Sequence, residues 1–235
     1  MTEPLHLKDS YLKEFNALVK EVNGNKVILD KTVFYSTSGG QPFDTGMIIK
    51  NNEEFKVINC YKENNKVIHE LDKEGLQVND NIKGVIDWDR RYRLMRSHTA
   101  LHILSSIVNK ETNALITGGN IDVDESRVDF SLENFDKDLM LKFVEKVNEL
   151  IKTNQDVSIS FMNREEALKI PGMVKLANVL PPEIKELRIV KIGNIDEQAD
   201  GGTHVKNTSE IGEIEFVKAE NKGKDRRRVY FKLKD

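Results

Sequence analysis

The sequence is poor in cysteine, proline and tryptophan: its 235 residues include one, five and one of them, respectively. The lone Cys60 cannot form a disulfide within the chain, and the first residues lack the basic and apolar stretches of a secretory signal. No apolar run approaches the roughly 18 to 20 residues that a membrane-spanning helix requires. We therefore expect a cytoplasmic protein that does not cross a membrane.

The net charge and the absence of nucleotide-binding loops argue against two further kinds of protein. The formal net charge is -3, which argues against unspecific adhesion to nucleic acid, although charge can still cluster locally. The sequence contains neither a phosphate-binding P-loop nor a Gly-x-Gly-x-x-Gly motif, so we expect no nucleotide cofactor. With 38% hydrophobic and 32% charged residues, the composition is that of a globular protein long enough for two domains.

The first part of the chain, residues 1–88, has the pattern of a small β-barrel. Short strands alternate with turns rich in asparagine and glycine, and no long helical period interrupts them. Closure into a barrel removes the exposed strand edges that such a sheet would otherwise have. The predicted strands are 15–22, 26–29, 55–62, 66–70 and 82–87.

The pattern changes near Trp88, and residues 89–235 predict an α+β domain with helices on a mainly antiparallel sheet. Asp89 can cap a helix over 90–110, and a second apolar stripe predicts a helix from Phe135 to Thr153. Alternating and β-branched segments supply the sheet. These segments are 127–132, 157–162, 186–192, 212–218 and 227–233.

Two short strings carry the chemistry. His98 and His102 are four positions apart, so on a helix both rings lie on one face and can chelate one ion. Asp200 and His204 repeat this spacing around Gly201-Gly202, which permits a tight turn. Three of the five histidines in the chain fall in these strings. We therefore predict one divalent metal site, with zinc favoured by the ligand types, although each string alone is also typical of an ordinary surface.

These motifs resemble the AlaX-type alanyl-tRNA editing proteins, free-standing relatives of the editing domain of alanyl-tRNA synthetase. The resemblance covers most of the chain. It is carried by the Gly-Gly-Gln segment within 29–46, by Arg96-Ser-His-Thr-Ala-Leu-His-Ile-Leu104, by Gln198-Ala-Asp-Gly-Gly-Thr-His-Val-Lys-Asn-Thr208 and by the closing strand 223–231.

The resemblance implies a zinc-dependent hydrolase that deacylates alanine tRNA mischarged with serine, with glycine as a further candidate. It implies one Zn²⁺ held by His98, His102, Asp200 and His204, although the family often has cysteine where this chain has Asp200. Asp200 either ligates the metal or stands back from it. Thr117 would recognise the serine hydroxyl, or it is an incidental threonine in a turn between a helix and a strand. Further substrate contacts would come from Gly39, Gly40, Gln41, Gly201 and Gly202.

Contacts with tRNA are predicted at two basic clusters, Arg90-Arg91 and Arg226-Arg227-Arg228. Each cluster is equally typical of a solvated face. We interpret Cys60 as a core residue, and His6 and His69 as surface residues. The oligomeric state and the groups that catalyse the reaction, other than the metal site, cannot be predicted.

Two alternative functions remain open at this point. The same metal fold could deacylate another mischarged tRNA, such as threonine tRNA carrying serine. The chain could instead be a non-catalytic tRNA-binding module with a structural zinc. The best support for this alternative is that Asp200 stands where the family often has cysteine.

Overall fold

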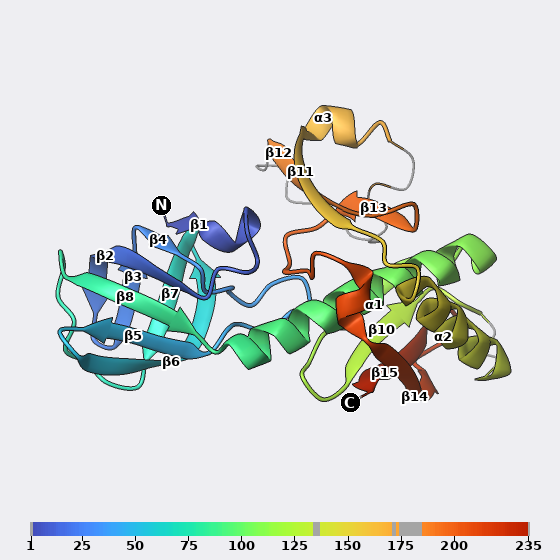
Figure 1. Ribbon diagram of the computed structural model, residues 1–235, viewed down its shortest axis with the longest axis horizontal. Coiled ribbons are helices and arrows are strands. Elements are labelled where there is room, and N and C mark those ends of the chain that lie inside the picture. The colour runs from blue at the N-terminus through green and yellow to red at the C-terminus, as the bar shows by residue number, and fades with distance from the viewer. Residues whose placement is uncertain (1, 134–136, 171–172, 174–184, 235) are drawn as a thin grey trace. The chain divides into compact units, whose positions relative to one another are not determined.

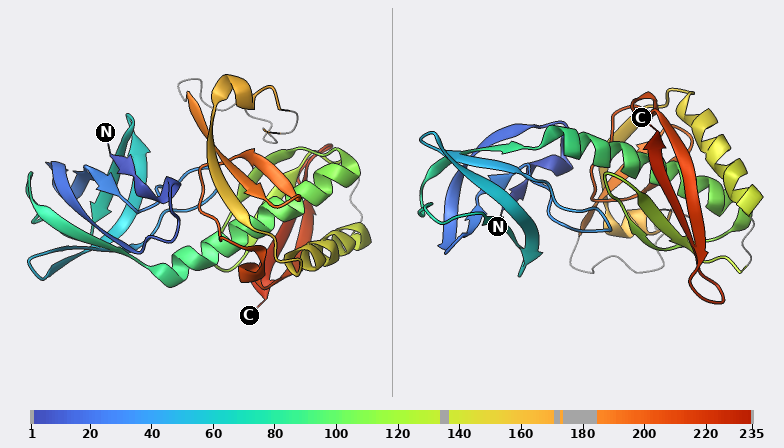
Figure 2. Two further views of the ribbon diagram at one scale, coloured as in Figure 1. Left: turned by 45° about the horizontal axis from the view of Figure 1, so that its top comes forward. Right: turned by 90° about the horizontal axis from the view of Figure 1, so that it is seen from below.

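The computed structural model describes residues 2–133, 137–170, 173 and 185–234 (Figures 1 and 2). The chain divides into two compact units, Met1–Arg93 and Leu94–Asp235. Within the described residues, no helix combines the length and the apolar character needed to cross a membrane.

The first unit is a closed barrel, which confirms the predicted β-barrel. Its interior is built by alternation: in β2, Phe15, Ala17 and Val19 are buried, whereas Glu14 and Asn16 are exposed. A short parallel pair, β1 (Glu3–Pro4) and β4 (Lys31–Thr32), lies outside the barrel order. The barrel strands, in spatial order, are β2 (Glu14–Asn23), β3 (Lys26–Leu29), β7 (Lys66–Leu71), β6 (Glu53–Glu63), β5 (Gly46–Lys50) and β8 (Asn81–Ile86).

Two polar side chains of the barrel correct the sequence interpretation. His69 is fully buried and His6 nearly so, whereas both were predicted at the surface. His69 lies in β7, where its Nε2 is 2.9 Å from Thr32 Oγ1, so the hydroxyl satisfies one ring nitrogen inside the barrel. Its cross-strand neighbour Cys60 is also fully buried, as predicted.

Helix α1 (Trp88–Thr112) begins in the first unit and ends in the second. Its cap is Asp87, whose Oδ1 accepts a hydrogen bond from the Arg90 N–H at 3.2 Å. The prediction that Asp89 caps the helix is wrong, because Asp89 already lies inside the first turn. The part of the helix that belongs to the second unit is anchored in the core by apolar residues. Among them, Leu94, Leu104 and Val108 are fully buried.

The second unit has the predicted α+β character. A sheet of order β14-β15-β10-β9 is antiparallel throughout, and a smaller antiparallel sheet has the order β11-β12-β13. Helix α2 (Lys137–Ile151) packs on β14, where the Asn148 side chain bonds both backbone groups of Ile214 at 2.9 Å. The predicted helix start at Phe135 lies outside the described residues. The remaining elements are β9 (Ile116–Asn120), β10 (Ser126–Phe130), β11 (Val157–Asn163), α3 (Arg164–Ala167), β12 (Glu186–Ile192), β13 (Asp196–Ala199), the short helix η2 (Thr208–Ile211), β14 (Glu213–Asn221) and β15 (Arg227–Lys234).

Candidate metal centre

Helix α1 places His98 and His102 on one face, one turn apart. Both residues are 4% exposed, and their ring centroids are 5.0 Å apart. The spacing of four residues produces this arrangement because a helix turns once in about 3.6 residues. The two histidines thus lie on one face of a helix, as their spacing predicts.

Asp200 and His204 come from the loop that follows β13. The Asp200 N–H donates to Arg188 O at 3.0 Å, so the loop begins alongside β12. The Gly202 N–H then donates to Asp200 Oδ2 at 2.6 Å and closes the turn. Neither Gly201 nor Gly202 has a positive φ, so the turn is closed by the carboxylate rather than by left-handed glycine backbone.

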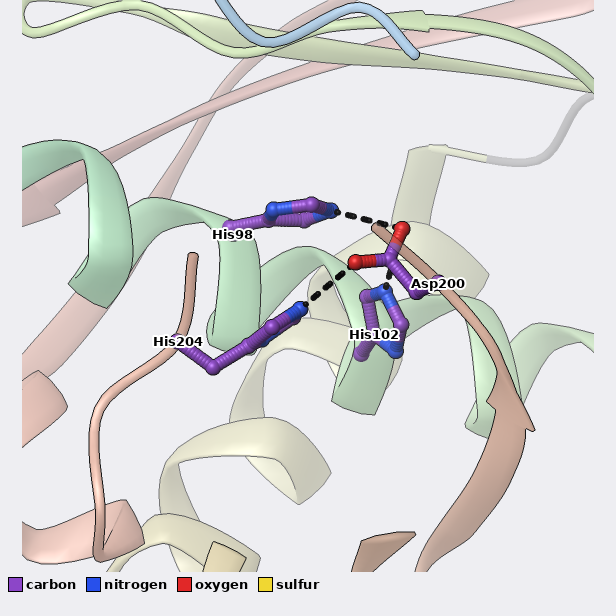
Figure 3. Close-up of side chains that lie close together, drawn as sticks. All are labelled: His98, His102, Asp200 and His204. Carbon is purple, nitrogen blue, oxygen red and sulfur yellow. Dashed lines mark hydrogen bonds and ion pairs between the residues drawn. The ribbon is translucent and has the colours of Figure 1, made fainter. Parts of the chain in front are cut away.

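The four side chains meet at one point (Figure 3). Their ligand atoms all lie within 4.8 Å of one another. Asp200 Oδ2 is 3.0 Å from His204 Nε2, and Asp200 Oδ1 is 3.7 Å from His98 Nε2 and 4.0 Å from His102 Nε2. The arms of a tetrahedral zinc site are 2.0–2.2 Å long, which puts neighbouring ligand atoms about 3.4 Å apart. The cluster therefore fits a metal ion in both donor type and spacing.

Burial keeps the imidazoles of His98 and His204 uncharged. It lowers the pKa of His204 to about 4 and, although Asp200 opposes the shift, lowers the pKa of His98 well below its usual value. The charges of Arg188 and of the neighbouring histidines add to this lowering. At neutral pH these rings keep a free lone pair, which is the form that binds a metal.

A further ring of polar groups surrounds the cluster. Asp196 Oδ2 is 3.1 Å from His102 Nδ1 and accepts a hydrogen bond from Gln198 Nε2 at 2.7 Å. Arg188 Nη1 donates to Asp200 O at 2.8 Å. Carboxylate support of this kind fixes the orientation of metal-binding histidines. Sequence reasoning missed Asp196 because the mainly polar strand β13 was not predicted. It missed Arg188 because the contact of this side chain with Asp200 O is not visible in the local pattern of β12.

Thr117 lies in β9, and its hydroxyl is buried without a hydrogen-bond partner among the described residues. The strand runs beside α1: a Cβ added at Gly119 would lie 3.9 Å from Leu101, the residue before His102. A buried hydroxyl without a partner costs free energy, and a ligand that supplied one would recover it.

The predicted glycine contacts differ in their availability. The Gly202 N–H donates to Asp200 Oδ2, so this group is engaged within the turn, and the role of Gly202 in substrate binding stays a prediction. Gly201 is exposed, and a Cβ there would meet no atom within 4 Å. Gly39 and Gly40 form a left-handed turn with φ 55 and 83, closed by reciprocal Ser38–Gln41 backbone bonds. They lie in the first unit, and their role in substrate binding stays a prediction.

The five arginines that were predicted to contact tRNA differ in how far they are buried and bonded. Arg91 is fully buried and bonds to Asp44, to Ser10 O and to Val33 O. The prediction that it contacts tRNA is wrong, because its guanidinium is fully buried and bonded inside the first unit.

The C-terminal arginines are engaged to different degrees. Arg227 is 7% exposed and donates to Gly223 O at 2.7 Å. Arg228 makes a bidentate pair with Asp129, with bonds of 2.7 and 2.8 Å. Arg226 is exposed. Of the predicted arginines, the half-buried Arg90 and the exposed Arg226 are best placed for phosphate.

Comparison with known proteins gives one consistent result. Residues 6–90 match the family model for class II (A) tRNA synthetases, and residues 187–230 match the second additional domain of threonyl- and alanyl-tRNA synthetases. The chain is 50% identical over its whole length to all of the alanyl-tRNA editing protein AlaX-M of Saccharolobus solfataricus, and 47% identical, again over both full lengths, to that of Methanosarcina barkeri. It is also 36% identical to an alanine–tRNA ligase of Saccharolobus islandicus, over 93% of this chain and 25% of the ligase.

Proposed function

The chain belongs to the AlaX-M alanyl-tRNA editing proteins, and from this membership we propose that it hydrolyses the ester of alanine tRNA mischarged with serine, and with glycine, at a zinc site. Alanyl-tRNA editing is the function of the family as its members are named. The observation that carries the proposal is the meeting of His98, His102, Asp200 and His204 at one point.

In this proposal the four residues hold one Zn²⁺, with Asp200 as the fourth ligand. When bound, zinc would supply a Lewis acid that can polarise an ester carbonyl. The exposed Gly201 backbone lies next to Asp200 and has open space beside it. We assign its N–H as a donor to the ester oxygen as negative charge develops there.

Selectivity requires a polar partner for serine. A pocket for alanine rejects serine weakly, because one hydroxyl or methylene changes binding there by only about 1 to 3 kcal/mol. A second site must therefore accept serine and spare alanine. The buried Thr117 hydroxyl, which has no other partner in the described structure, can exchange a hydrogen bond with the serine hydroxyl. Alanine offers no such group.

The test is a deacylation assay with a panel of charged tRNAs in the presence of zinc. The panel holds alanine tRNA carrying serine, glycine or alanine, and threonine tRNA carrying serine. We expect rapid loss of serine from alanine tRNA and little loss of alanine. Faster hydrolysis of the threonine tRNA would contradict the substrate assignment. Binding of alanine tRNA without hydrolysis would instead support a non-catalytic module.

A further inference from the structure

A hydroxyl group lies behind the ring of His204. Thr99, in α1 between the two histidines of the cluster, is fully buried, and its Oγ1 is 3.1 Å from His204 Nδ1. The opposite ring nitrogen, Nε2, faces Asp200. A neutral imidazole that ligates a metal through one nitrogen carries its proton on the other.

The other contacts of this hydroxyl decide what it offers to the histidine. Thr99 Oγ1 donates to Met95 O at 3.0 Å and accepts from the Val205 N–H at 3.3 Å. A hydroxyl has one proton and two acceptor lone pairs. With its proton given to Met95, Thr99 has one lone pair left for His204. The contact is therefore satisfied when His204 carries its proton on Nδ1.

We infer that Thr99 is a positioning residue: it holds His204 in the tautomer that presents the Nε2 lone pair to the metal. The inference rests on the proposed metal site. Without a metal, the Asp200 carboxylate oxygen, 3.0 Å from Nε2, favours the opposite tautomer with its proton on Nε2. Thr99 opposes that preference by favouring the proton on Nδ1. Moving the proton from Nε2 to Nδ1 when the metal binds therefore costs less free energy.

Removal of the hydroxyl tests this role through metal affinity rather than through activity. Thr99→Val keeps the shape of the side chain and removes its acceptor. We expect the zinc affinity, measured by competition with a chromophoric chelator, to fall about 10- to 100-fold, the usual effect of losing such a support. Thr99→Ser restores the hydroxyl and should return the affinity to within a few-fold of the unmodified chain. The visible spectrum of the cobalt-substituted protein should change in the valine variant only.

Thr208→Val is the matched control. Thr208 is also fully buried, and its Oγ1 donates to Ile151 O at 3.0 Å and accepts from the Gln155 N–H at 2.9 Å. Its loss removes the same kind of backbone bonds without touching the cluster, so stability should fall while zinc affinity stays unchanged. Unaltered affinity in Thr99→Val, or an equal loss in Thr208→Val, would overturn the inference. Absence of zinc binding by the unmodified chain would be a different result, because it would overturn the metal site itself.

Discussion

Asp200 supplies the only carboxylate among the four ligand atoms of the cluster, at a position where the resembling family often has cysteine. A carboxylate is a harder and weaker ligand for zinc than a thiolate. In the proposed zinc site, the residue at this position would therefore set how tightly the ion is held.

We predict that Asp200→Cys binds zinc at least about 10-fold more tightly, because a thiolate is the softer ligand. Asp200→Asn should bind more weakly, because the amide carries no charge. Chelator competition measures both constants. If the cysteine variant bound zinc no better than the unmodified chain, Asp200 would not be a ligand.

Thr117 is predicted to set the choice between serine and alanine. Thr117→Val removes the hydroxyl, and a hydrogen bond of this kind is worth about 1 to 1.5 kcal/mol. The ratio of kcat/KM for seryl- and alanyl-tRNA should therefore fall about 10-fold. Thr117→Ser, which keeps the hydroxyl, is the control. An unchanged ratio in the valine variant would remove this role from Thr117.

His69 links the stability of the barrel unit to pH. Burial lowers the pKa of His69 to about 4, below the ordinary histidine pKa of about 6.5. Between these pH values the unfolded chain binds a proton that the folded barrel excludes. The stabilising contribution is therefore fully present above pH 6.5 and is lost as the pH falls toward 4.

We predict that His69 alone costs the first unit about 2 kcal/mol of unfolding free energy between pH 7 and pH 4.5. Urea unfolding followed by Trp88 fluorescence measures it, because Trp88 packs against the barrel core. His69→Gln cannot titrate, so its loss over the same range should be smaller by that amount. Equal losses in both proteins would refute the lowered pKa.

Among the strands, those with clear alternation were predictable from sequence and those held by their neighbours were not. The prediction gave 26–29 and 186–192 with the bounds of β3 and β12. It missed β9, whose Gly118-Gly119 pair is unfavourable in a strand, and β13, whose residues are mainly polar. Pairing with β10 and β12 holds these two strands in place, and pairing is not visible in a local pattern.

Strand β5, also missed, depends on a glycine. Gly46 has φ 156 and pairs with both Val57 and Ile86. A Cβ there would overlap Val85 O and lie 2.8 Å from Ile86 Cα. We predict that Gly46→Ala destabilises the barrel unit by about 2 to 4 kcal/mol, since backbone cannot move aside cheaply. Urea unfolding followed by Trp88 fluorescence checks this, and a change below about 0.5 kcal/mol would contradict it.

For the whole molecule, the sequence was sufficient for the fold class and for the meeting of the four cluster residues. Local spacing encodes the short alternating strands, the helical turn between His98 and His102, and the tight turn before His204. That the two strings share one site was inferred from their repeated ligand spacing and from the family resemblance, not from any local pattern. The supporting residues Thr99 and Asp196 could not be predicted, because their roles arise from contacts about a hundred positions apart. The burial of Arg91 was missed for the same reason.

The central claim is that residues from two distant segments hold one metal ion that the hydrolysis requires. The most direct test is to strip the protein with a chelator and titrate zinc back while measuring deacylation of seryl-tRNA for alanine. We predict no activity without metal, full recovery at one zinc per chain, and no recovery in His204→Ala. Full activity of the stripped protein, or of His204→Ala without bound metal, would contradict it.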